Sequence, residues 1–205
     1  LSLKKFTRNI MGSSVDLNTI WAALSVLVGI STVTLYTKSI FSGDTKPHEF
    51  TWLIWAITQG TATAILWQAG GGKGAIYLTI GTVIVFAIFI LLLFRGSRNI
   101  TNSDVLVLAL ALLGFGIWWF LENPLLAVIL MSSIDVSGYI PTFRKSYSLP
   151  DTETSAFWFA FGATNILSIL ALENYNALTL TYLVSIAAAN ISLGLFLIWR
   201  RQRTP

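Results

Sequence analysis

The sequence predicts an all-α membrane protein with seven transmembrane helices, and three observations support this fold class. First, the chain of 205 residues is 55% hydrophobic and 11% charged, with a mean hydropathy of +0.72, whereas soluble domains carry about 25% charged residues. Second, it contains seven apolar runs close to the roughly 20 residues that span a bilayer as a helix. Third, only short links separate these runs, so no separate soluble domain is expected.

Each apolar run is expected to be a helix, because lipid offers no partners for backbone N–H and C=O groups and a helix satisfies them within the segment. Short polar links follow the first six runs: "SGDTKPHE", "QAGGGKG", "RGSRNITNS", "LENP", "KSYSLPDTE" and "ENYNAL". In chain order, the runs cover residues 18–40, 50–68, 75–94, 104–121, 124–143, 156–173 and 181–199.

The basic residues predict the orientation of such a bundle. The chain has 13 Lys and Arg residues and a net charge of +4, which in a membrane protein indicates cytoplasmic loops and not nucleic-acid binding. Seven spans put four of them on the side of the N-terminus, namely Lys4, Lys5, Arg8 and Lys73. The remaining nine lie on the other side, which is therefore expected to be cytoplasmic together with the C-terminus.

An internal repeat appears when the chain is shifted against itself by 106 residues. The stretch "YTKSIFSGDTKPHEFTW" (36–52) then falls on "TFRKSYSLPDTETSAFW" (142–158) without a gap. Shared hydrophobicity alone could align two apolar sequences. Here, however, the polar links that follow the first and fifth runs align with each other, and so do the spans and their charged ends, which favours a duplication. Matched pairs include Trp52 with Trp158, Thr58 with Thr164, Gln59 with Asn165, Leu66 with Leu172 and Arg95 with Arg201.

The duplication predicts two triple-helix repeats joined by one helix, a 3+1+3 arrangement. Because a single helix lies between them, both repeats have the same orientation, and parallel repeats of this kind are typical of transporters. The predicted segments are an N-terminal tail (1–17), a first repeat (18–95), a linker helix (96–121), a second repeat (122–201) and a C-terminal tail (202–205).

This arrangement, with a proline near the end of a repeat's first helix, resembles the SWEET/PQ-loop superfamily over residues 18–200. That superfamily includes sugar carriers, lysosomal amino-acid exporters, vitamin-precursor carriers and, in the same fold, the KDEL receptor. Its Pro-Gln pair corresponds here to Pro141-Thr142 in the second repeat and to Leu35-Tyr36 in the first. The first repeat therefore lacks the proline. The Trp and Asn of the sugar carriers' site have no clean counterparts, although Tyr182 lies near the Asn position.

Asp135 is the only carboxylate deep within a predicted span, where a charge is costly unless it is protonated or paired. Ser132 lies one turn before it on the same helical face, and Pro141 follows six residues later. Asp135 is therefore a candidate for proton coupling or for binding a substrate amine, and the alternative is a packing role. Pro141 is a candidate hinge, with a purely structural helix break as the alternative.

Polar and aromatic side chains within other spans are candidates for binding a small polar ligand. The amides Gln59 and Asn165 hold equivalent places in the two repeats, and Trp55 shares a helical face with Gln59. The alternatives are an interfacial aromatic belt and amides that bond between helices. The predicted substrate-binding residues are Gln59, Trp55, Asn165, Tyr182, Ser185 and Asn190.

The composition argues against an enzyme. The single histidine, His48, lies in a link and there is no cysteine, so neither a catalytic triad nor a transition-metal site can be assembled in a membrane cavity. No span has the interior Lys that a retinal protein needs. We therefore expect no cofactor and no metal, and as partners the bilayer and a small-molecule substrate, with a homo-oligomer left open.

The predicted function is an alternating-access carrier for a small polar solute such as a sugar, an amino acid or a vitamin precursor, with proton coupling through Asp135 left open. The alternative is a receptor or scaffold of the same fold that binds without transport. A receptor for a peptide terminus would collect charges around its cavity, and this chain offers only Asp135 there, which favours the carrier.

Overall fold

The computed structural model describes residues 16–42, 49–95, 102–148 and 150–203. These residues form eight α-helices and two short 3₁₀ turns and contain no strand, which confirms the all-α prediction for this part of the chain. Most of the predicted N-terminal tail, the link residues 43–48, the start of the linker segment and the last two residues lie outside the described residues. The helices are α2 (Leu17–Ser42), α3 (Glu49–Gln68), α4 (Ile76–Arg95), α5 (Asn102–Phe120), α6 (Pro124–Ser137), α7 (Ile140–Ser148), α8 (Ser155–Leu170) and α9 (Ala177–Arg201), with 3₁₀ turns at Gly72–Ala75 and Pro150–Thr152.

Local sequence sets where α6 and α9 begin. Asn123 caps α6 by accepting a hydrogen bond from the backbone of Leu126 at 3.1 Å, and Pro124 follows at a position where its missing N–H costs nothing. Asn176 caps α9 in a reciprocal capping box with Thr179. These caps satisfy backbone N–H groups that a helix start would otherwise leave without partners.

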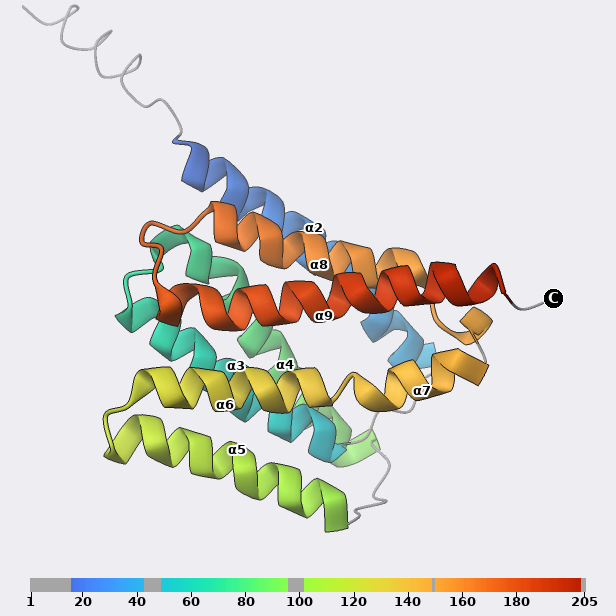
Figure 1. Ribbon diagram of the computed structural model, residues 1–205, viewed down its shortest axis with the longest axis horizontal. Coiled ribbons are helices and arrows are strands. Elements are labelled where there is room, and N and C mark those ends of the chain that lie inside the picture. Colours follow the sequence, from blue (N-terminus) through green and yellow to red (C-terminus); the bar gives the residue numbers. More distant parts are fainter. Residues whose placement is uncertain (1–15, 43–48, 96–101, 149, 204–205) are drawn as a thin grey trace, which may run out of the picture.

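The fifth predicted run, 124–143, is not one continuous helix. It is divided into α6, which ends at Ser137, and α7, which begins at Ile140, and Figure 1 shows the two following one another almost in line. Pro141 is the cause, because it has no amide hydrogen to donate to the Ser137 carbonyl four residues earlier. Helical bonding resumes where Phe143 donates to the Tyr139 carbonyl at 2.9 Å.

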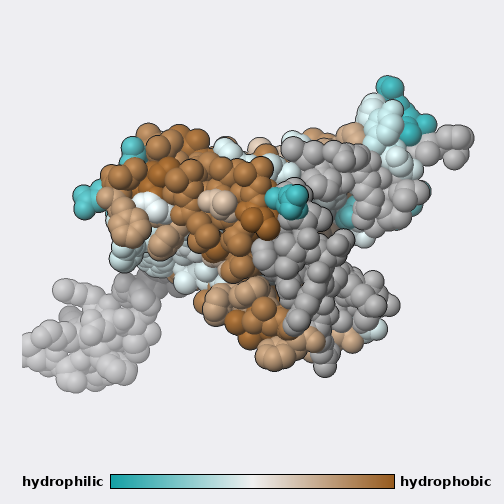
Figure 2. Space-filling model, turned by 90° about the horizontal axis from the view of Figure 1, so that it is seen from below, coloured by the Kyte–Doolittle hydropathy of each residue, from teal (hydrophilic) through white to brown (hydrophobic). Residues whose placement is uncertain are grey.

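Three helical segments are long and apolar enough to cross a membrane, namely 17–35, 72–94 and 177–201. Three more apolar helices are shorter, and they cover 105–120, 124–137 and 155–170. Helix α5 exposes Leu106, Leu113, Phe120 and other large apolar side chains. Figure 2 shows a broad hydrophobic surface on one side of the molecule, with hydrophilic residues toward its edges. A surface of this kind suits lipid contact and is rare on soluble monomers.

Two groups of helices make up the bundle (Figure 1). Helix α8 packs against α2 and α9, while α3 packs against α4, α5 and α6. Contacts between α6 and α9 connect the two groups. The main hydrophobic cluster lies where they meet, and it includes the fully buried side chains of Ile65, Leu66, Val128, Leu172 and Leu183.

Candidate functional site

Asp135 lies in the core of the bundle, on the face of α6 that packs against α3 and α9. The residue is only 5% exposed. Thr58 of α3 donates its hydroxyl hydrogen to one carboxyl oxygen at 2.5 Å, and the Tyr182 hydroxyl of α9 donates to the other. Each carboxyl oxygen therefore has one hydroxyl donor, and the two donors come from different helices.

Among the residues that the structure describes, no basic side chain pairs with this carboxyl group. Among the buried residues that the structure describes, Asp135 is the only one with a charged side chain. The titratable groups around it are phenols, because Tyr182 and Tyr139 both interact with it electrostatically and Tyr77 of α4 interacts with each of those two tyrosines. A buried carboxylate without a cation is costly, so the site suits a proton or an arriving cationic group.

Tyr139 extends the site to α8 and α9. It follows Asp135 by one helical turn, and its ring lies against the Trp158 indole with 5.7 Å between centroids. Its hydroxyl interacts with the side chain of Asn190, and the Asn190 amide nitrogen itself donates to the Ile186 carbonyl at 2.8 Å. The break between α6 and α7 thus lies beside a continuous polar and aromatic surface.

Three of the predicted binding residues meet at this centre. Tyr182 contacts Asp135 directly, and Asn190 contacts Tyr139. The Trp55 indole nitrogen lies 3.8 Å from the position that a Cβ on Gly138 would occupy, at the end of α6. These three side chains come from α3 and α9 and surround the C-terminal half of α6.

The two predicted amides behave differently from each other. Gln59 turns toward α4 and donates to the Leu78 carbonyl at 3.3 Å, so it joins two neighbouring helices and is not brought to Asp135. Asn165 is 3% exposed and donates to the Phe161 carbonyl of its own helix at 2.9 Å. Its side-chain oxygen is buried and has no hydrogen-bond partner among the described residues. The same is true of the indole nitrogen of Trp158. Ser185 is half-buried on α9.

Pro141, the predicted hinge, is the second residue of α7. Its position in the backbone explains why the fifth run is divided into two helices. Because Gly138 and Tyr139 separate the two helices, this is the point at which α6 and α7 can bend relative to each other. The role of Pro141 as a hinge stays a prediction.

A second set of buried hydroxyls joins α2 to α8. The Ser25 hydroxyl donates to the Thr164 carbonyl at 2.8 Å and lies 2.8 Å from the hydroxyl oxygen of Ser168. Across this contact, the hydroxyl of Tyr77 interacts with the Thr164 side chain. Ser25, Thr164 and Ser168 are all buried.

At one end of the bundle, two loops close tightly over this core. They comprise residues 69–74, between α3 and α4, and residues 171–176, between α8 and α9. Asn174 and Asn176 donate to the carbonyls of Gly70 and Ala69 at 3.1 and 3.2 Å. Gly70 has a φ of +78°, which favours glycine, and a side chain there would also collide with Asn174. We call this arrangement the loop pair.

An ion pair reinforces the loop pair. Lys73 contacts Asp16, just before α2, at 2.5 Å. The hydrogen bond from Lys73, helped by those from the hydroxyl and backbone of Thr19, holds the pKa of Asp16 well below its ordinary value of 3.8. Because both side chains are accessible to water, the pair contributes only modestly to stability.

We expect Asp16→Asn to lower the melting temperature of the purified protein slightly at neutral pH. A carboxylate with a depressed pKa stabilises the folded state above its ordinary pKa of 3.8 and loses that effect as the pH falls through the folded pKa. The difference between wild type and Asp16→Asn should therefore shrink in acid, as measured by thermal unfolding over a pH series. An equal difference at every pH would contradict the ion pair as the cause.

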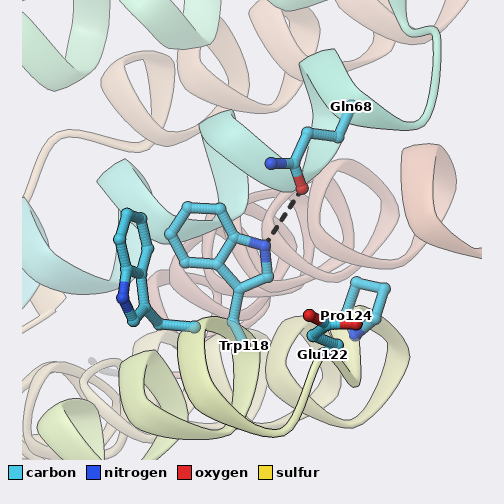
Figure 3. Close-up of a pocket in the computed structure, with 5 residues that line it drawn as sticks. Gln68, Trp118, Glu122 and Pro124 are labelled. Atoms are coloured by element: carbon cyan, nitrogen blue, oxygen red, sulfur yellow. Dashed lines mark hydrogen bonds between the residues drawn. The ribbon is translucent and has the colours of Figure 1, made fainter.

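Surface depressions lie away from the buried polar centre. One of about 360 Å³ is shown in Figure 3, where the Trp118 indole donates to the Gln68 side-chain oxygen at 3.1 Å. Another of about 310 Å³ lies between α2 and α4 and includes Lys38 and Phe41. Neither of these two depressions includes Asp135, which is buried. The first depression is lined by Gln68, Trp118, Trp119, Glu122 and Pro124.

Several residues of the site do not belong to the predicted binding residues, among them Thr58, Tyr77, Tyr139 and Trp158. Thr58 could have been selected from the sequence, because the predicted repeat aligns it with Thr164. Tyr139 could also have been selected, because it follows Asp135 at helical spacing. No feature of the sequence pointed to Tyr77, since only the packing of α4 brings it to the core.

The described residues include no group of three or more His, Cys, Asp or Glu side chains that could hold a metal ion. The chemistry of the centre is therefore that of one carboxyl group, three phenols, several alcohols, two amides and two indoles. Comparison of the chain with family models, with curated proteins and with solved structures gave no match.

Proposed function

We propose that the protein is an alternating-access membrane carrier for a small polar solute, in which Asp135 takes up and releases a proton during the cycle. The observation that carries this proposal is the buried carboxyl group of Asp135, which is held by hydroxyls of two other helices and paired with no basic side chain in the described part of the chain. Intramembrane carboxylates in such surroundings mark ion or substrate pathways.

The local hydrogen bonds suit both protonation states of Asp135. As a carboxylate, it accepts from Thr58 and Tyr182. As an acid, it can donate to the Thr58 oxygen, because the Thr58 hydrogen has a second acceptor in the Trp55 carbonyl at 3.4 Å. A proton can thus come and go with only a turn of one hydroxyl group, which keeps the cost of each state low.

We further propose seven spans in a 3+1+3 arrangement, and the packing supports this. Shifting the chain by 106 residues exchanges α2 with α6, α3 with α8 and α4 with α9. The contacts map onto one another under this exchange: α2 with α4 corresponds to α6 with α9, and α3 with α4 corresponds to α8 with α9. Between the halves, the α2–α8 contact corresponds to the α6–α3 contact. Helix α5 stands outside the exchange, as expected of a linker.

The repeat also relates individual side chains at the centre. Thr58 and Thr164 are both fully buried, and each hydroxyl lies near the carbonyl three residues earlier in its own helix, at 3.4 and 2.7 Å. Leu66 and Leu172 meet in one hydrophobic cluster. Carriers built from parallel repeats place their substrate at such an interface.

The solute is expected to be small and to carry both donors and acceptors. The unpartnered oxygen of Asn165 can accept a hydrogen bond, and the unpartnered indole N–H of Trp158 can donate one. Aromatic walls with a few polar groups suit a sugar, an amino acid or a vitamin precursor.

Purified protein in proteoliposomes should take up one class from a panel of labelled solutes of these three kinds, and an imposed pH gradient should drive its accumulation. Specific binding without uptake would instead favour a receptor of this fold.

The orientation can be tested separately, because the chain has no cysteine. Ser42→Cys and Ser148→Cys lie at equivalent positions of the two repeats, so a membrane-impermeant thiol reagent should label both from the same side of the membrane. The charge asymmetry predicts that this is the cytoplasmic side. Labelling of the two positions from opposite sides would contradict both the topology and the repeat.

A further inference from the structure

The environment of Asp135 has a counterpart in the other half of the core, and the counterpart lacks the acid. Under the 106-residue shift Thr58 corresponds to Thr164, and Asp135 corresponds to Gly29. Both threonines are fully buried, one at the α3–α6 contact and the other at the α2–α8 contact. The two halves therefore present the same hydroxyl, but only one presents a carboxyl group opposite it.

Tyr77 fills the place that the missing acid leaves. A Cβ on Gly29 would overlap the ring of Tyr77, so the ring lies directly against the α2 backbone. The Tyr77 hydroxyl interacts with Thr164, just as the Tyr182 hydroxyl and Thr58 share Asp135. The counterpart of Tyr182 is Ile76, so the phenol comes from the equivalent helix and is shifted by one residue.

We infer that Tyr77 makes the central site one-sided, because its ring closes the position beside Gly29 and Thr164, at the α2–α8 contact, and restricts the solute to the side that holds Asp135. This inference rests on the proposed function. Its physical basis is volume: a phenol ring occupies space that the symmetric partner leaves for a carboxyl group, and close-packed interiors do not yield such space without a change of side chain. Tyr77 is thus a residue that determines which solutes fit.

One consequence concerns the class of solute. A symmetric site with two carboxyl groups would suit a solute with two cationic ends or a bulky one. With Tyr77 in place, the site suits one small solute with a single group directed at Asp135, and its other end meets an aromatic ring and neutral hydroxyls. The size limit is set by Gly29 and Tyr77 together, since a side chain at position 29 would displace the ring.

Single cysteines at the two equivalent threonines test this inference without knowledge of the solute. Thr58→Cys and Thr164→Cys are made separately in the full chain, which is otherwise free of cysteine. Protein in membranes is treated with an ethylammonium methanethiosulfonate, and the rate of modification is measured by the mass of the purified protein. We expect Thr58→Cys to react as the carrier opens, and Thr164→Cys to be protected by Tyr77.

Variants of Tyr77 complete the design. In a Tyr77→Ala background, Thr164→Cys should lose its protection and react at a rate close to that of Thr58→Cys. In a Tyr77→Phe background, the ring remains and protection should persist. If Tyr77→Ala does not fold, as judged by gel filtration and thermal unfolding, Tyr77→Leu takes its place, because leucine also lacks the outer atoms of the ring. Thr164→Cys is then expected to react in the Tyr77→Leu background.

The outcomes separate this inference from the function on which it rests. Equal reaction at both cysteines with Tyr77 present would overturn the one-sided site and leave the carrier intact. Protection of Thr164→Cys that persists when the ring is removed, while Thr58→Cys reacts, would do the same. Failure of both positions to react in every background would show that water never reaches the centre, which would overturn the carrier itself.

Discussion

Replacing Asp135 with asparagine should abolish uptake driven by a pH gradient, while solute binding and exchange without a gradient persist. Asparagine keeps the size of the side chain and an oxygen that can accept from Thr58, but it cannot take up or release a proton. The expected measurement is accumulation of labelled solute in proteoliposomes under an inward proton gradient, compared with exchange at equal pH on both sides. Only the gradient-driven component should disappear.

The same variant separates two other roles of Asp135. If the carboxylate binds a cationic group of the solute, affinity itself should fall, by about 2–5 kcal/mol for a buried, hydrogen-bonded charge pair. If Asp135 only holds helices together, pH dependence and affinity should both be unchanged. Asp151→Asn is the matched control, because Asp151 is exposed and contacts only Arg201 at a distance of 3.4 Å among the described ion pairs. Unaltered binding and unaltered pH-driven uptake in Asp135→Asn would end the case for a functional carboxylate.

That Asp135 would need polar partners in the core could be predicted from the sequence, because a lone acid in a long apolar run is costly unless it is protonated or paired. Its partners could not. Many hydroxyl residues lie within the apolar runs, and helical spacing alone cannot tell which of them reaches a given carboxyl group. Tyr182 was expected near a solute, whereas in the structure it donates to Asp135.

Gln59 shows the limit of arguments from a helical face. Its position beside Trp55 predicted a side chain directed at a central cavity, yet its amide donates to the Leu78 carbonyl of α4. Helix α3 packs against α4, α5 and α6, so several of its faces meet protein. For such a helix, the sequence shows which side chains share a face but not which neighbour that face meets.

The 106-residue repeat stays a prediction about the architecture, and its register depends on polar links and charged ends and not on hydrophobicity alone. It also made the difference between the halves interpretable. Gly29 in place of Asp135 could be found from the sequence, but the ring of Tyr77 against Gly29 could not. Tyr77 lies one residue away from the counterpart of Tyr182, and a shift of that kind becomes visible only once the helices are packed.

Cysteines at Ser25 and Ser168 should form a disulfide that stops transport until it is reduced. The two hydroxyl oxygens lie 2.8 Å apart, and both residues are buried at the contact between α2 and α8. Sulfur atoms in their place need only a small rotation to reach the bond length of about 2.05 Å. Because α2 and α8 belong to different repeats in the proposed arrangement, this bond would tie the two halves of the proposed carrier together.

The effect should be reversible and specific to the pair. Ser25→Cys/Ser168→Cys should lose solute exchange after mild oxidation and regain it with a reductant, whereas either single variant should show no such change. Ser25→Cys with Ser133→Cys is the matched control, since Ser133 is exposed on α6. Absence of a cross-link would contradict the packing of α2 on α8. A cross-link without loss of exchange would show that the two helices keep their contact throughout the cycle, so that the moving interface must lie at the α3–α6 contact, where Thr58 holds Asp135.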